Sequence, residues 1–103
     1  SVTYASPDFE RLIVEYDAYI RSSGYLKGST CYAYTTAVRE FFRRMGSLGP
    51  SEYSQLTLLY VTNCISKTAE EAPLGIFNEI IALRSFARFI AEIHPELPDL
   101  QLP

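Results

Sequence analysis

The sequence predicts an all-α protein, a single domain folded as a four-helix bundle. Apolar residues recur at spacings of three and four in four separate stretches, which is the pattern of helices that bury one face. Glycine and proline residues lie between these stretches and end helices there. The chain has 103 residues, a usual size for one domain, and 48% of them are hydrophobic. That is enough for a core without a metal or a disulfide.

The first helix is expected at residues 7–23. Ser6 supplies a capping hydroxyl, Pro7 stands where its missing N–H costs nothing, and Asp8 lies near the positive end of the helix dipole. Gly24 is expected to end the helix. The residues predicted to form its buried stripe are Phe9, Leu12, Ile13, Tyr16, Tyr19 and Ile20.

The second helix is expected at residues 29–45, where Gly46 ends it and a loop follows to Ser54. Its buried stripe is predicted to contain Cys31, Tyr34, Val38, Phe41, Phe42 and Met45. At about 100° per residue, a second stripe falls on another side of the helix. That stripe contains Tyr32, Thr36, Arg39 and Arg43.

The third helix is expected at residues 57–68, with Thr57 as its N-cap. Residues 56–61 could also form a short strand, but the spacing of the apolar residues and the absence of any partner strand favour a helix. The residues predicted to be buried are Leu58, Val61, Cys64 and Ile65.

The fourth helix is expected at residues 74–94, between Pro73 and Pro95. It is the most apolar of the four, and such a helix packs centrally against several others. The tail through Pro98 and Pro103 is expected to be extended and to resemble the start of a linker. The apolar residues that cover over half of the helix are Ile76, Phe77, Ile80, Leu83, Phe86, Ala87, Ile90 and Ile93.

The residues that carry most enzyme chemistry are scarce. The single histidine, His94, stands at a helix end, where a cation is favourable, and the two cysteines have no spacing suited to zinc. Glu70 and Glu71 are neighbours and diverge, so they predict a solvated acidic turn rather than an acid–base pair. Phosphate loops and dinucleotide fingerprints are missing too. We therefore expect no catalytic residues, no metal and no cofactor in this chain.

The sequence also predicts where the protein is found. It contains no apolar run long enough to span a membrane and no signal peptide. Cys31 and Cys64 fall on the buried side of predicted helices, and two thiols without a secretion signal indicate reduced, buried residues. We expect a cytoplasmic protein that makes no contact with a membrane.

The net charge is −3, from nine basic and twelve acidic residues, and such a balance alone argues against nucleic acid. The distribution is less simple, because Arg39/Arg43 and Arg84/Arg88 form two pairs at i,i+4 spacing. One interpretation is that these arginines are ordinary solvated faces, partly paired with glutamates. The other is that the second and fourth helices contact the DNA backbone together, with Lys27 beside the free N–H groups that begin the second helix.

Four segments resemble the N-terminal domain of tyrosine recombinases, the phage-integrase family. Residues 29–34, S-T-C-Y-A-Y, followed by Val38, are similar to the signature that opens the second helix of that domain. Residues 80–90, I-I-A-L-R-S-F-A-R-F-I, resemble the family's L-S-A-L-R-S-F-F-R-F-L helix, with Ala87 in place of a common aromatic residue. Residues 12–24 resemble its opening helix, and His94-Pro95 its exit, with histidine for the usual asparagine.

The resemblance covers roughly residues 9–103 and implies a SAM-like core-binding domain. In this family such a domain forms half of a C-shaped clamp around a recombination site, and its second and fourth helices face the major groove. Double-stranded DNA and other recombinase protomers are then the expected partners. The resemblance also implies that the catalytic residues belong to a following domain that is absent from this chain.

The residues that this hypothesis assigns to DNA come from two sources. Thr30 and Arg84 match family motif positions, although Arg84 could equally be an intramolecular brace, and Tyr34 matches a tyrosine that we interpret as core. The complete set of candidates is Lys27, Ser29, Thr30, Tyr32, Arg39, Arg43, Asn78, Arg84 and Arg88. The alternative is a helical protein–protein interaction module that uses Phe77, Ile81, Arg84 and Arg88 and does not bind DNA.

Overall fold

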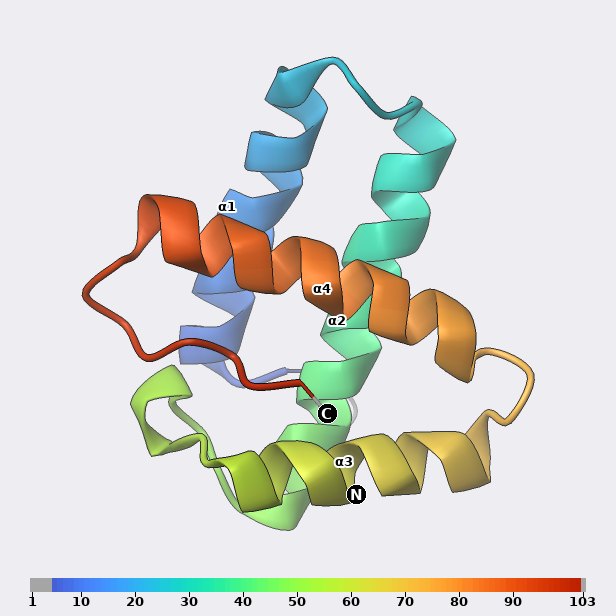
Figure 1. Ribbon diagram of the computed structural model, residues 1–103, viewed down its shortest axis with the longest axis vertical. Helices are drawn as coiled ribbons and strands as arrows, with labels where there is room; N and C mark the ends of the chain where they lie inside the picture. Colours follow the sequence, from blue (N-terminus) through green and yellow to red (C-terminus); the bar gives the residue numbers. More distant parts are fainter. Residues whose placement is uncertain (1–4, 103) are drawn as a thin grey trace.

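The computed structural model describes residues 5–102, and all of the regular structure in this range is helical. The helices are α1 (Pro7–Ser23), α2 (Gly28–Leu48), the short 3-10 helix η1 (Tyr53–Gln55), α3 (Leu58–Glu71) and α4 (Ile76–Ile93). In Figure 1, α1 and α2 run side by side in opposite directions, and α4 crosses both of them. α3 crosses the end of α2 that is distant from the α1–α2 connection. The predicted all-α four-helix bundle is confirmed.

Capping residues explain where α1 and α3 begin. The Ser6 hydroxyl accepts a hydrogen bond from the Phe9 N–H (3.3 Å), and the Thr57 hydroxyl accepts one from the Tyr60 N–H (3.2 Å). Gly24 follows α1 with a φ of 75°, a left-handed conformation that favours glycine. These are the start and stop residues that the sequence predicted.

Three helix ends differ from the prediction by two residues or more. α2 continues through Gly46 to Leu48, and Gly49 follows it with a φ of 133°. Leu48 packs against the core, so three more helical residues bury apolar surface. α3 extends to Glu71, whose carboxylate accepts a hydrogen bond from Arg44 of α2. α4 begins only at Ile76, because a turn occupies the two residues after Pro73.

α2 is the central helix of the bundle, whereas the sequence predicted that role for the fourth helix. α2 packs extensively against α1, α3 and α4, while α4 has its main contact with α2. Phenylalanine rings fill the junction between them: Phe42 of α2 lies 4.7 Å from Phe9 of α1 and 5.3 Å from Phe86 of α4, measured between ring centroids. Cys31 and Cys64 are free and buried, as predicted.

Three residues predicted to be buried are exposed. The exposed fractions are 80% for Phe77, 52% for Leu58 and 44% for Ile93. On α4 the buried stripe is Glu79, Ala82, Leu83, Phe86, Phe89 and Ile90. At about 100° per residue, Phe77 falls on the opposite side of the helix. The abundance of apolar residues on α4 therefore overstated how much of its circumference is buried.

The tail after α4 packs back onto the bundle instead of leaving it as a linker. Leu100 belongs to the core cluster, and the Tyr53 hydroxyl donates a hydrogen bond to the Pro98 carbonyl (2.8 Å). In Figure 1 this segment passes between α4 and η1. Pro103, the end of the predicted linker, lies outside the described residues. Apolar burial at Leu100 and Leu97 explains why this proline-containing segment stays docked.

Candidate nucleic-acid interface

One side of α2 faces α1 and is occupied by polar pairs. The Thr35 hydroxyl donates to the Asp17 carboxylate (2.8 Å), and the Arg39 guanidinium makes a forked contact with the Glu10 carboxylate, its shortest N–O distance being 2.6 Å. The hydrogen bonds that Arg39 donates to Glu10 raise the pKa of Arg39 and so keep its charge fixed. Arg39 therefore joins α2 to α1.

Arg43 lies one helical turn beyond Arg39. Its guanidinium pairs with the Glu40 carboxylate at 3.0 Å on the same helix. Both arginines of the first predicted pair, Arg39 and Arg43, therefore form ion pairs with carboxylates of this chain. Tyr32, which is exposed, follows the same stripe seven residues before Arg39.

The opposite side of α2 borders a groove shared with α4. The groove has a volume of about 300 Å³, and none of the side chains that line it is acidic. Two predicted residues of α2, Ser29 and Thr30, meet one of α4, Asn78, in this groove. Its lining residues are Ser29, Thr30, Ala33, Tyr34, Ala37, Asn78 and Ile81.

The N-terminus of α2 stands at one end of this groove. Lys27 occupies the N-cap position, and no side chain caps the helix there. The first N–H groups of a helix have no partners within it, and they carry a partial positive charge. Lys27 itself makes no ion pair with the described residues.

Arg84 and Arg88 lie on the outer side of α4, opposite its buried stripe. They follow Ile81 by three and seven residues, so all three share one helix face. Both arginines are exposed. Among the described residues neither has a carboxylate partner, unlike Arg39 and Arg43.

The structure does not bring the two predicted arginine pairs onto one rim. Arg39 is two residues from Ala37, which lines the groove, so the two side chains leave α2 about 160° apart. The nine candidates fall into two groups. The first group contains Ser29, Thr30 and Asn78, which line the α2–α4 groove, together with Lys27 at the N-cap of α2 and Arg84 and Arg88 on the helix face of Ile81. The second group, Tyr32, Arg39 and Arg43, lies on the far side of α2.

Arg44 is the arginine whose role the sequence analysis missed. Its side chain is only 9% exposed and bonds the carboxylates of Glu79 in α4 (3.0 Å) and Glu71 in α3 (2.8 Å). Burial raises the pKa of Glu79, and the Arg44 charge opposes that rise. Arg44 thus connects three helices. A signal existed, because Arg44 follows the buried Phe41 by three residues and so falls on the inner half of α2.

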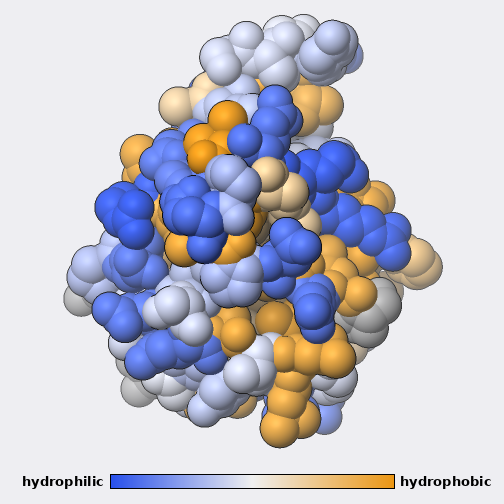
Figure 2. Space-filling view, turned by 60° about the vertical axis from the view of Figure 1, so that its left-hand side comes forward, coloured by the Kyte–Doolittle hydropathy of each residue, from blue (hydrophilic) through white to orange (hydrophobic). Residues whose placement is uncertain are grey.

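His94 forms a second polar junction, at the end of α4. Its Nε2 contacts the Glu15 carboxylate of α1, and its Nδ1 lies 3.0 Å from the Glu96 carboxylate of the tail. The hydrogen bond that the His94 imidazole donates to Glu96, followed by the one that it donates to Glu15, raises the pKa of His94. Figure 2 shows the α1 side of the molecule, which is mainly hydrophilic with apolar patches between the charged groups.

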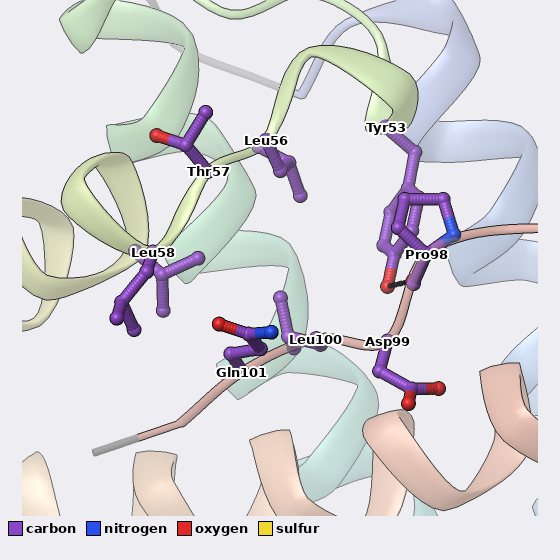
Figure 3. Close-up of a pocket in the computed structure, with 9 residues that line it drawn as sticks. Tyr53, Leu56, Thr57, Leu58, Pro98, Asp99, Leu100 and Gln101 are labelled. Carbon is purple, nitrogen blue, oxygen red and sulfur yellow. Dashed lines mark hydrogen bonds between the residues drawn. The ribbon is translucent and has the colours of Figure 1, made fainter.

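A small pocket of about 140 Å³ lies between the tail and the start of α3 (Figure 3). Asp99 is the only acidic or basic residue among those that line it, so the pocket holds no pair of groups for proton transfer. Elsewhere, burial raises the pKa of Tyr16 and of Cys64 to about 12, which keeps both protonated at neutral pH. Within residues 5–102 there is no group of three side chains suited to a metal ion.

No protein family, curated protein or solved structure matches the chain. The resemblance to tyrosine recombinases is therefore a prediction from the sequence motifs alone. None of the helices described is long and apolar enough to cross a membrane.

Proposed function

We propose that this domain binds double-stranded DNA through the α2–α4 groove and the two arginines on the outer face of α4, Arg84 and Arg88. The observation that carries the proposal is the grouping of Lys27, Arg84 and Arg88. Lys27 precedes the groove residue Ser29 by two positions, and Arg84 and Arg88 share the helix face of the groove residue Ile81. No lining residue of the groove is acidic, and none of the three cations is paired with a carboxylate among the described residues. This local positive surface explains how an acidic chain can bind a polyanion.

Each part of the surface has a chemical role in the proposal. Arg84 and Arg88 contact phosphates, since a guanidinium can bond two phosphate oxygens at once. The uncapped N-terminus of α2 offers N–H groups to another phosphate beside Lys27. Asn78 lines the groove and can bond a base edge, because its amide both donates and accepts hydrogen bonds.

The wider biological role proposed is that of a core-binding domain in a tyrosine recombinase. The four sequence motifs support it, and two of the motif residues are Thr30, which lines the groove, and Arg84, which follows the lining residue Ile81 by three positions on the same helix. Strand exchange itself would need a catalytic domain with its own arginines, histidine and tyrosine. Sequencing the gene beyond the codon for Pro103 tests this part separately from DNA binding.

A salt titration tests DNA binding. Fluorescence anisotropy with a labelled duplex should show affinity that falls with salt at a log–log slope of about −2.7, the value for three phosphate contacts. Lys27→Gln should make the slope shallower by about 0.9. Arg11→Gln, a matched charge change on the exposed face of α1, should leave it unchanged. Absence of binding at low salt, or equal effects of the two variants, would overturn the proposal.

A further inference from the structure

The outer face of α4 exposes apolar residues that DNA phosphates cannot use. Phe77 is 80% exposed, and Ile81 follows it by one helical turn. Leu74, two residues before the start of the helix, is almost fully exposed. Contiguous apolar groups of this kind on a soluble domain mark binding surfaces for other macromolecules.

The groove beside this face has the shape to receive a helix. Its floor on α2 includes Ala33 and Ala37, whose small side chains leave space between α2 and α4, and Tyr34 lines it beside them. Ile81 belongs both to the groove and to the exposed face of α4. The apolar surface is therefore continuous from Phe77 into the groove, as in sites that bind an amphipathic helix through residues at i, i+3, i+4 and i+7.

The charges around the groove define what else the partner must carry. Arg84, Arg88 and Lys27 border the apolar surface, and no carboxylate of the described residues pairs with them. The other five arginines all have carboxylate partners within the chain. A partner that complements the charges of Arg84, Arg88 and Lys27 therefore has to carry acidic groups of its own.

We propose that the α2–α4 groove and the Phe77 face bind an acidic amphipathic helix of a partner protein. The apolar side of that helix covers Phe77, Ile81 and the groove floor, and its glutamates or aspartates meet Arg84, Arg88 and Lys27. Such a helix competes with DNA for the same cations. The inference does not depend on DNA binding, because the apolar contacts are specific to the protein partner.

A synthetic peptide tests the inference. The probe is a helix of about four turns with leucines at i, i+3, i+4 and i+7 and glutamates at the flanking positions. Titration of the labelled peptide with the intact chain should show saturable binding. Two control peptides, one with lysine for each glutamate and one with serine for each leucine, should bind at least about 10-fold more weakly.

Variants of the chain locate the site. Phe77→Ala should weaken peptide binding by about 10-fold, and Val14→Ala, a matched truncation of an exposed apolar residue on α1, should not change it. Both substitutions are at exposed positions, and thermal unfolding checks that each variant is folded. Phe77→Ala should leave DNA affinity unchanged, so failure of this inference and failure of the DNA proposal give different results.

Three results would overturn the inference. The first is equal binding of the acidic and the lysine peptides. The second is peptide binding that Phe77→Ala does not alter. The third is concentration-dependent self-association in sedimentation that Phe77→Ala abolishes, since the occupant of this face would then be a second copy of the chain.

Discussion

Two arginine pairs in this molecule have the same spacing and different surroundings. Arg39/Arg43 on α2 and Arg84/Arg88 on α4 are both i,i+4 pairs, and both fit a phosphate-binding ridge in the sequence. In the structure, the first pair is matched by Glu10 and Glu40, whereas the second has no carboxylate partner among the described residues. Spacing decides which face of its own helix a side chain occupies. Nearby carboxylates, on the neighbouring helix for Arg39 and on the same helix for Arg43, decide whether its charge is available.

The largest effect, on the free energy of unfolding, is expected at Arg44. This arginine is buried, unlike the members of the two pairs. Arg44→Ala leaves the Glu79 carboxylate buried without its partner, and this should lower the free energy of unfolding by about 3–5 kcal/mol. Arg43→Gln, at the neighbouring but more exposed position, should cost less than about 1 kcal/mol. Urea denaturation measures both. Similar losses for the two variants would contradict the assigned role of Arg44.

The second-largest effect is expected on DNA affinity, and it distinguishes the two arginine pairs directly. The double variant Arg84→Gln/Arg88→Gln should weaken binding of duplex DNA by about 10-fold and make the salt slope shallower by about 1.8. Arg39→Gln/Arg43→Gln removes the same charge and should leave DNA affinity nearly unchanged. If the second double variant loses as much affinity as the first, the interface includes the far side of α2 and the comparison fails.

A smaller effect is expected on stability at Arg39. Its pair with Glu10 is more than one third exposed, so Arg39→Gln should lower the free energy of unfolding by only about 0.2–1 kcal/mol. Arg84→Gln, which removes no ion pair, should lower it by less. Thermal unfolding at matched ionic strength compares the two single variants. A loss of stability for Arg84→Gln that equals or exceeds the loss for Arg39→Gln would contradict the finding that Arg39 is paired and Arg84 is not.

The smallest effect concerns pH and the His94 junction. Because the pKa of His94 is raised in the folded state, its stabilising contribution is fully present below the unfolded value of about 6.5. The contribution is lost as the pH rises through the folded value. His94→Asn should therefore destabilise the protein by less than about 1 kcal/mol near pH 6 and by almost nothing near pH 9. If the difference in free energy of unfolding between the unaltered protein and His94→Asn grows with pH, His94 is not stabilised in its protonated form in the folded state.

Local sequence patterns predicted much of the fold, because capping and periodicity are local. Ser6, Thr57 and Gly24 act where they were expected to act. Gly46 did not end α2, since Leu48 gains burial that outweighs the cost of a helical glycine. Phe77 was misplaced because an apolar residue does not report which side of its helix the neighbours cover.

The candidate site was less predictable, since it depends on contacts between helices. Ser29, Thr30 and Asn78 meet in one groove, and their proximity follows from the crossing of α2 and α4. The pairing of Arg39 with Glu10 joins residues on different helices, so spacing within α2 could not reveal it. For the same reason, the tail was expected to be a linker although Leu100 reaches the core.

The central claim is that the DNA-binding surface is the α2–α4 groove with the outer face of α4. Amide chemical-shift mapping during titration with duplex DNA at low salt tests it most directly. The account predicts shifts concentrated at Lys27, Ser29, Thr30, Asn78, Arg84 and Arg88. Shifts concentrated on α1 or on the stripe of Tyr32, Arg39 and Arg43 would contradict it.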